Sequence, residues 1–112
     1  MATDYAAILA RKLEALFPDI AARAEAESIL ATYGVEPHER EVPRVRLAAL
    51  KLAGVSISEL RRHVEVAKRD YRDALAAAEY PAQMRGPTSP APDERRRLIA
   101  EDTAAYAAWL SG

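Results

Sequence analysis

The fold is decided by residues 54–81, which read GVSISELRRHVEVAKRDYRDALAAAEYP. A helix start is marked by Ser56 and Glu59, which have the Ser-x-x-Glu spacing of a capping box, where each side chain bonds the other residue's main-chain N–H. A helix stop is marked by Pro81, because a proline ring clashes with the preceding helical turn. We therefore predict one long central helix over about residues 56–79.

Apolar residues of this stretch recur at alternating spacings of three and four, which places them along one face of a helix. This apolar stripe comprises Ile57, Leu60, Val64, Ala67, Tyr71, Ala74 and Ala78. The opposite face carries charged residues with an excess of Arg and Lys. One short neighbour cannot cover a helix this long, and its alanines let other helices approach closely. We expect it to be the spine of a bundle.

The composition predicts a single all-α domain over residues 1–112, a compact bundle of about five helices. Half of the residues are hydrophobic, but 25 are alanine, the best helix former and a poor filler of a core. Cysteine is absent, which excludes disulfides and thiolate chemistry. The sequence shows neither a long apolar run nor a basic leader, so we expect a soluble cytoplasmic protein with no membrane partner.

The net charge of −1 conceals an uneven distribution. Residues 1–39 contain three Lys/Arg and seven Asp/Glu, whereas residues 40–73 contain nine and five. The basic excess therefore lies on the central helices. Two interpretations stay open: it pairs with the acidic first third, within the chain or in a homo-oligomer, or it meets an acidic partner.

Three shorter helices are expected before the central one. The first is capped by Thr3 or Asp4. Proline is favoured at the first position of a helix, so Pro18 and Pro43 should open the next two, and Gly34 should end the second. The expected ranges are 4–17, 18–33 and 43–53.

The segment 80–92 contains four prolines, at 81, 87, 90 and 92, which predicts an irregular connection across the bundle surface. Asp93 should then cap a last helix. Asp102 interrupts the apolar stripe of that helix. A buried carboxylate needs a partner, so we expect one such as an arginine beside Asp102.

The sequence offers little for catalysis or metal binding. His38 and His63 lie 25 residues apart, outside any spacing that places two metal ligands on one helical face. GxSxG, P-loop and GxGxxG motifs are absent. We predict a non-enzymatic protein with no cofactor and no metal; an enzyme would require a deep pocket containing Asp102 or His63.

Residues 46–63 contain a helix, an Ala-Gly-Val-Ser turn and a second helix with two arginines. This pattern resembles the helix-turn-helix of lac-repressor-like and MerR-like regulators. The resemblance implies a turn at Gly54, core positions at Val55 and Leu60, and four residues facing the DNA major groove: Ser56, Ser58, Arg61 and Arg62. Ile57 separates the two interpretations, because a recognition helix would expose it and the bundle would bury it.

A second resemblance rests on residues 68–81, KRDYRDALAAAEYP, with the DERRR segment at 93–97 and the tryptophan-containing last helix. It is to small bacterial proteins sharing a KRDYRDxLAxAEYP stretch. This resemblance implies a compact helical bundle and no particular activity.

From these patterns we predict a protein that acts through protein–protein interaction with a protein partner. The candidate interaction surface is a basic rim beside an apolar hook, made of Arg61, Arg62, Arg69, Arg72, Tyr80, Pro81 and Met84. The alternative function is DNA binding through residues 46–63, with nucleic acid as the partner.

Overall fold

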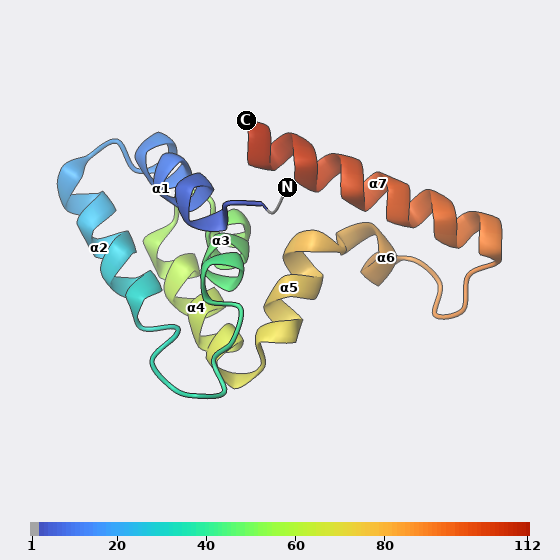
Figure 1. Ribbon diagram of the computed structural model, residues 1–112, viewed down its shortest axis with the longest axis horizontal. Coiled ribbons are helices and arrows are strands. Elements are labelled where there is room, and N and C mark those ends of the chain that lie inside the picture. The colour runs from blue at the N-terminus through green and yellow to red at the C-terminus, as the bar shows by residue number, and fades with distance from the viewer. Residues whose placement is uncertain (1–2) are drawn as a thin grey trace.

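The computed structural model describes residues 3–112, and over this range the chain forms seven α-helices and no strands (Figure 1). The helices are α1 Tyr5–Leu16, α2 Ile20–Ala31, α3 Val42–Ala53, α4 Ile57–Arg69, α5 Tyr71–Glu79, α6 Pro81–Arg85 and α7 Pro92–Ser111. The predicted all-α class is confirmed. The predicted number of about five is wrong, because the central helix is divided and a short helix precedes the last one.

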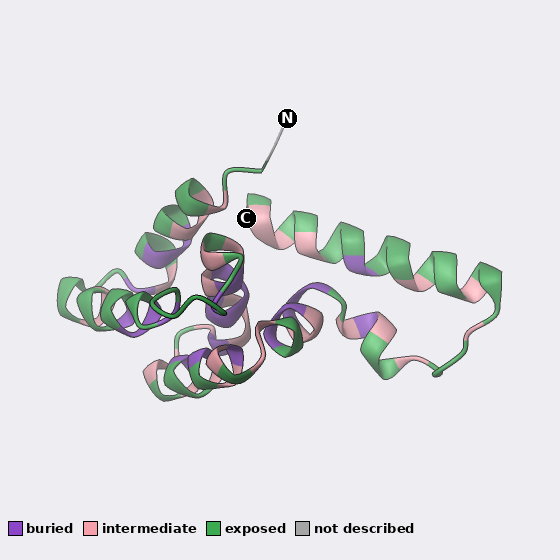
Figure 2. Ribbon diagram, turned by 60° about the horizontal axis from the view of Figure 1, so that its bottom comes forward, coloured by how far each residue is buried: buried purple, intermediate pink, exposed green. Residues whose placement is uncertain are grey.

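Helix α3 forms the centre of the core and packs against α1, α4 and α5. Its Leu47 and Leu50 are fully buried, and buried residues surround most of its circumference (Figure 2). Four further core residues come from the helices around it: Leu13, Leu30, Leu60 and Leu75. A helix apolar nearly all round requires such enclosure, since any exposed face would leave its leucines in water.

The predicted single helix over 56–79 is two helices, α4 and α5, separated by Asp70. The backbone of Asp70 is extended, with φ −155° and ψ 103°. Its N–H donates to the Val66 carbonyl and closes α4, while its carboxylate accepts from the Arg72 N–H at 3.1 Å and caps α5. A short acidic side chain competes in this way with helix continuation. Asp70 therefore ends one helix and begins the next.

The apolar stripe still faces the core across this break. Leu60, Val64 and Ala67 of α4 are buried, as are Ala74 and Ala78 of α5. The other two members of the stripe, Ile57 and Tyr71, are partly buried and pack against the core. The change of direction at Asp70 lets α5 follow α3, so the periodicity identified the buried face although the helix is not continuous.

Two helix starts differ from the sequence prediction. Helix α2 begins after Asp19, whose carboxylate accepts a 2.8 Å hydrogen bond from the Ala22 N–H, so Pro18 precedes the helix. Helix α7 begins at Pro92, and Asp93 lies inside its first turn rather than at the cap. Both starts still follow the usual preferences, aspartate as the cap of α2 and proline as the first residue of α7, one or two positions from the predicted start.

The segment 80–92 is not irregular throughout, because Pro81 opens the short helix α6. Irregular chain then leads to α7, which extends along one side of the molecule (Figure 1). The far end of α7 is held by α1: Lys12 donates to the Gly112 main-chain oxygen at 3.0 Å, and its ammonium lies 4.5 Å from the centre of the Trp109 ring. Helix α7 is thus anchored at α6 and at α1.

Candidate functional site

The structure does not bring the seven residues of the predicted interaction surface together. Arg61 and Arg62 lie on the first half of α4 and are already paired, Arg61 with Glu25 at 2.6 Å and Arg62 with Glu59 at 2.7 Å. The Arg61–Glu25 pair joins the acidic first third to the central basic region, as one interpretation of the charge pattern expected. These two arginines are therefore less available to an external partner.

Tyr80, Pro81 and Met84 lie where α5 meets α6. Tyr80 is 41% exposed and Met84 is 59% exposed. Tyr80 lines a different cavity from Arg69 and Arg72. The predicted surface therefore divides into three parts, and the largest volume belongs to the depression lined by Arg69 and Arg72, about 600 Å³ against about 270 Å³ for the one lined by Arg61.

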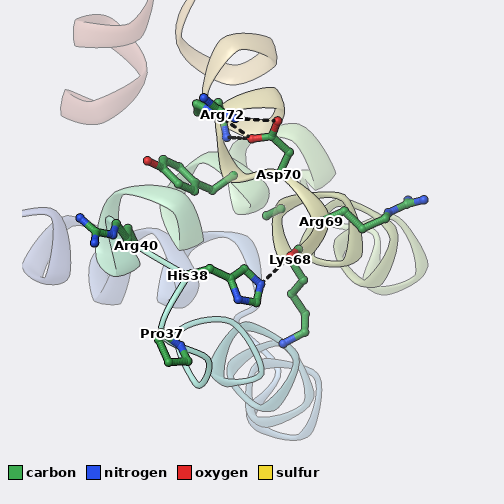
Figure 3. Close-up of a pocket in the computed structure, with 9 residues that line it drawn as sticks. Pro37, His38, Arg40, Lys68, Arg69, Asp70 and Arg72 are labelled. Atoms are coloured by element: carbon green, nitrogen blue, oxygen red, sulfur yellow. Dashed lines mark hydrogen bonds and ion pairs between the residues drawn. The ribbon is translucent and has the colours of Figure 1, made fainter.

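This depression, which we call the basic groove, occupies about 600 Å³ at the break between α4 and α5 (Figure 3). One wall is the α4–α5 junction, residues 67–72. The other wall is the loop before α3, represented by Pro37, His38 and Arg40. Arg40 and Arg69 lie on opposite sides of the groove with their guanidinium groups pointing outward, away from each other, and Arg72 lies at a third edge (Figure 3).

The cations of the basic groove differ in how they are held. Lys68 donates to the Glu39 carboxylate at 2.8 Å and to the Thr32 carbonyl at 2.7 Å. Arg72 bonds Asp70 at 3.1 Å. Over residues 3–112, Arg40 and Arg69 form neither an ion pair nor a side-chain hydrogen bond, and both are exposed. The groove therefore presents two free guanidinium groups.

Glu39 fixes the loop wall of the groove. It is 5% exposed, and its carboxylate also accepts hydrogen bonds from the main-chain N–H groups of Gly34, Val35 and Glu36. The Lys68 hydrogen bond opposes the effect of burial, and with these amides it lowers the pKa of Glu39 to about 2. A charged Glu39 thus holds the loop against α4.

The loop is tied down at a second point by the hydroxyl of Tyr33, which donates a 2.6 Å hydrogen bond to the Arg40 carbonyl. Burial, followed by the charge of Glu39, raises the pKa of Tyr33 to about 12. The sequence patterns did not predict this wall, and no local signal identifies it, because it depends on the pairing of Glu39 with Lys68, 29 positions away.

Some residues of the helix-turn-helix resemblance lie where it implies and others do not. Val55 is 69% exposed instead of core, whereas Leu60 is buried. Ile57 packs against the core, as the apolar stripe requires. Gly54 does form the turn, with φ +62°, and Ser56 caps α4 by accepting from the Glu59 N–H at 3.2 Å.

Asp102 and His63 occupy structural positions. Both Asp102 oxygens accept hydrogen bonds from residues 82 and 83 of α6. His63 is half-buried, 3.6 Å from Glu59. Burial and then the charge of Arg62 lower the pKa of His63, with Glu59 opposing. Over residues 3–112, no cluster of three or more His, Asp or Glu side chains has a metal-binding arrangement.

We found no match to this chain among protein-family models, curated proteins or solved structures. None of the helices described in residues 3–112 combines the length and apolar character needed to cross a membrane.

Proposed function

We propose that the protein is a non-enzymatic binding module that docks an acidic segment of a partner protein in the basic groove. The observation that carries this proposal is the pair of free guanidinium groups of Arg40 and Arg69, on opposite sides of one depression. Arginine side chains bind carboxylates with two parallel hydrogen bonds, which gives both strength and direction. An extended chain with acidic residues could engage both sides.

The groove is already formed in the free protein, which favours binding. Glu39 and Tyr33 hold its loop wall, and Asp70 holds Arg72 at the edge. A surface fixed in this way loses little conformational freedom when a ligand binds. Glu39 and Asp70 already have partners, so their carboxylates do not cancel the charge of Arg40 and Arg69.

An acidic polypeptide fits this surface better than a nucleic acid. Exposed carboxylates lie close in sequence to the residues that line the groove: Glu36, Glu41, Glu65 and Asp73. A uniformly charged phosphate backbone would run close to these groups, whereas a short peptide can place its acids only where arginine lies. The overall net charge of −1 also opposes general attraction of nucleic acid.

The proposal is tested by titrating the protein into a short, fluorescently labelled Glu-rich peptide and following anisotropy at about 50 mM and about 200 mM salt. We expect saturable binding that weakens with salt. The double variant Arg40→Glu/Arg69→Glu should weaken binding about tenfold or more. Arg95→Glu/Arg97→Glu, which reverses two exposed arginines on α7 and makes the same change in net charge, is the matched control and should change binding less than about twofold.

Three results would overturn the proposal. One is equal binding by the Arg40→Glu/Arg69→Glu variant and the Arg95→Glu/Arg97→Glu control. Another is tighter binding of a labelled random DNA duplex than of the peptide. If the Arg61→Glu/Arg62→Glu variant also bound that duplex more weakly, the result would favour the DNA alternative. The third is self-association through the groove. A sedimentation mass that rises with the concentration of the unmodified protein, but not with that of the Arg40→Glu/Arg69→Glu variant, would place a second copy of the chain there.

A further inference from the structure

A second cavity, separate from the basic groove, lies where α7 crosses α1, α3 and α5. It has a volume of about 330 Å³ and is lined by Tyr5, Arg44, Glu79, Tyr80, Tyr106 and Leu110, among others. We call it the tyrosine pocket. Its volume lies at the lower end of the range for small-molecule sites, and three of its lining side chains are phenols.

The charges of the tyrosine pocket are already matched within the protein. Arg44 donates two hydrogen bonds to Glu79, at 2.8 Å and 2.5 Å. The Asp102 carboxylate is occupied by hydrogen bonds from α6. Because no charge on the pocket wall lacks a partner, a charged ligand would have to compete with an existing pair. The pocket therefore favours a neutral molecule.

One polar group in the tyrosine pocket lacks a partner. The Tyr106 hydroxyl is buried and, over residues 3–112, makes no hydrogen bond. Burial raises the pKa of Tyr106 above its ordinary value, and the neighbouring Glu79 adds to this effect, so the phenol stays protonated. A buried hydroxyl can both donate and accept, and leaving it unmatched is unfavourable. Tyr106 lines the pocket but its hydroxyl is covered, so a molecule in the pocket would supply the missing partner once the ring turns toward it.

The remaining surface of the pocket suits an aromatic ring. Tyrosine rings pack against other rings in offset or edge-to-face arrangements. Leu110 and the methyl group of Ala107 add apolar contact. An enclosed cavity of about 150 Å³ holds benzene in a protein interior. The tyrosine pocket is larger and open to solvent, so a substituted ring would fit and would stay partly exposed.

We propose that the tyrosine pocket binds a small neutral aromatic molecule with one hydrogen-bonding substituent, whose ring lies among the tyrosines and whose substituent bonds the Tyr106 hydroxyl. This site does not depend on the basic groove, so either proposal can fail alone.

Trp109 provides the readout, because it is the single tryptophan of the chain and its ring centre lies 5.9 Å from that of Tyr106. We would titrate phenol, benzene and cyclohexanol while following Trp109 fluorescence, and confirm each complex by amide chemical shifts. Phenol has both ring and hydroxyl, benzene lacks the hydroxyl, and cyclohexanol lacks the aromatic ring. We expect phenol to bind more tightly than either, by about three- to tenfold over benzene.

Two variants locate the binding. In Tyr106→Phe the preference for phenol over benzene should disappear while benzene binding persists. In Ala107→Leu, where the larger side chain fills the pocket, binding of all three molecules should be lost with the helical circular dichroism unchanged. Three results would each overturn the proposal: absence of phenol binding, equal binding of the three molecules, or a phenol preference retained in Tyr106→Phe. Absence of phenol binding would leave water as the partner of the hydroxyl.

Discussion

Asp102, on α7, accepts a 2.8 Å hydrogen bond from the main-chain N–H of Ala82, in the first turn of α6. The same carboxylate accepts from the main chain and the side-chain amide of Gln83, at 3.1 Å and 3.0 Å. Burial would raise the pKa of Asp102, but these hydrogen bonds outweigh it and the pKa is lowered. A charged residue of α7 thus caps α6 and joins the two helices.

Asp102→Ala should destabilise the fold by about 2–3 kcal/mol, because it removes a charged acceptor and leaves the amides of α6 without partners. The free energy of unfolding in urea measures this loss. Asp93→Ala, which removes an exposed acid from the same helix, is the control and should change little. Similar free energies for the two variants would mean that Asp102 does not hold α6.

The fold should lose stability on acidification through Glu39. Its folded-state pKa of about 2 lies below the ordinary value of 4.5, so ionised Glu39 stabilises the fold above about pH 4.5, and this contribution disappears as the pH falls towards 2. Glu39→Gln should be less stable by about 2 kcal/mol at neutral pH and should show a shallower decline below pH 5. Urea unfolding measured from pH 7 to pH 2 checks this. Parallel profiles for the two proteins would contradict it.

Two glycines with positive φ should differ in their tolerance of a side chain. Gly34 has φ +104°, and an added Cβ would lie 2.8 Å from a Val42 methyl group, whereas Gly54 has φ +62° and open space. Gly54→Ala should cost about 1–2 kcal/mol from backbone strain, and Gly34→Ala about 3 kcal/mol because crowding is added. The Val42→Ala substitution relieves this crowding. Gly34→Ala should therefore lower the free energy of unfolding less in the Val42→Ala background than in the unmodified protein. Equal costs in the two backgrounds would argue against the contact.

Replacing the unpartnered hydroxyl of Tyr106 should not weaken the free protein. Tyr106→Phe should leave the free energy of unfolding unchanged or raise it by up to about 1 kcal/mol, since no hydrogen bond is lost. Tyr33→Phe is the matched control and should cost about 1 kcal/mol, because that hydroxyl bonds the Arg40 carbonyl. A larger loss for Tyr106→Phe than for Tyr33→Phe would show that its hydroxyl has a partner in solution.

Local signals predicted much of the fold. The Ser56 cap, the stop before Pro81 and the apolar stripe identified helix ends and the buried face, because each depends on neighbours in sequence. The Glu59 half of the capping box does not form, because the Ser56 N–H donates to the Ala53 carbonyl and the Glu59 carboxylate bonds Arg62. The break at Asp70 was missed although Asp70 and Asp73 have the spacing of an N-cap and an acidic third helical position. A continuous stripe concealed this signal, since both helices bury the same face.

The remaining features depend on contacts between distant segments. Burial of Asp102 was foreseen, but its partner was expected to be an arginine and is the main chain of α6. Helix α6 is too short to be predicted from its own sequence, and its cap comes from α7. Arg69 and Arg72 were foreseen as a basic surface. The opposite wall of the basic groove depends on the Glu39–Lys68 pair, which joins residues 29 positions apart. Sequence patterns alone do not encode such pairs.

The central claim, that the basic groove binds an acidic polypeptide, is tested most directly by mapping amide chemical shifts during titration with the Glu-rich peptide. We expect the largest changes at residues 38–40 and 67–72, in fast exchange and absent from the Arg40→Glu/Arg69→Glu variant. Changes centred on Arg61 and Arg62, on the arginines of α7, or spread evenly over the surface would contradict the claim.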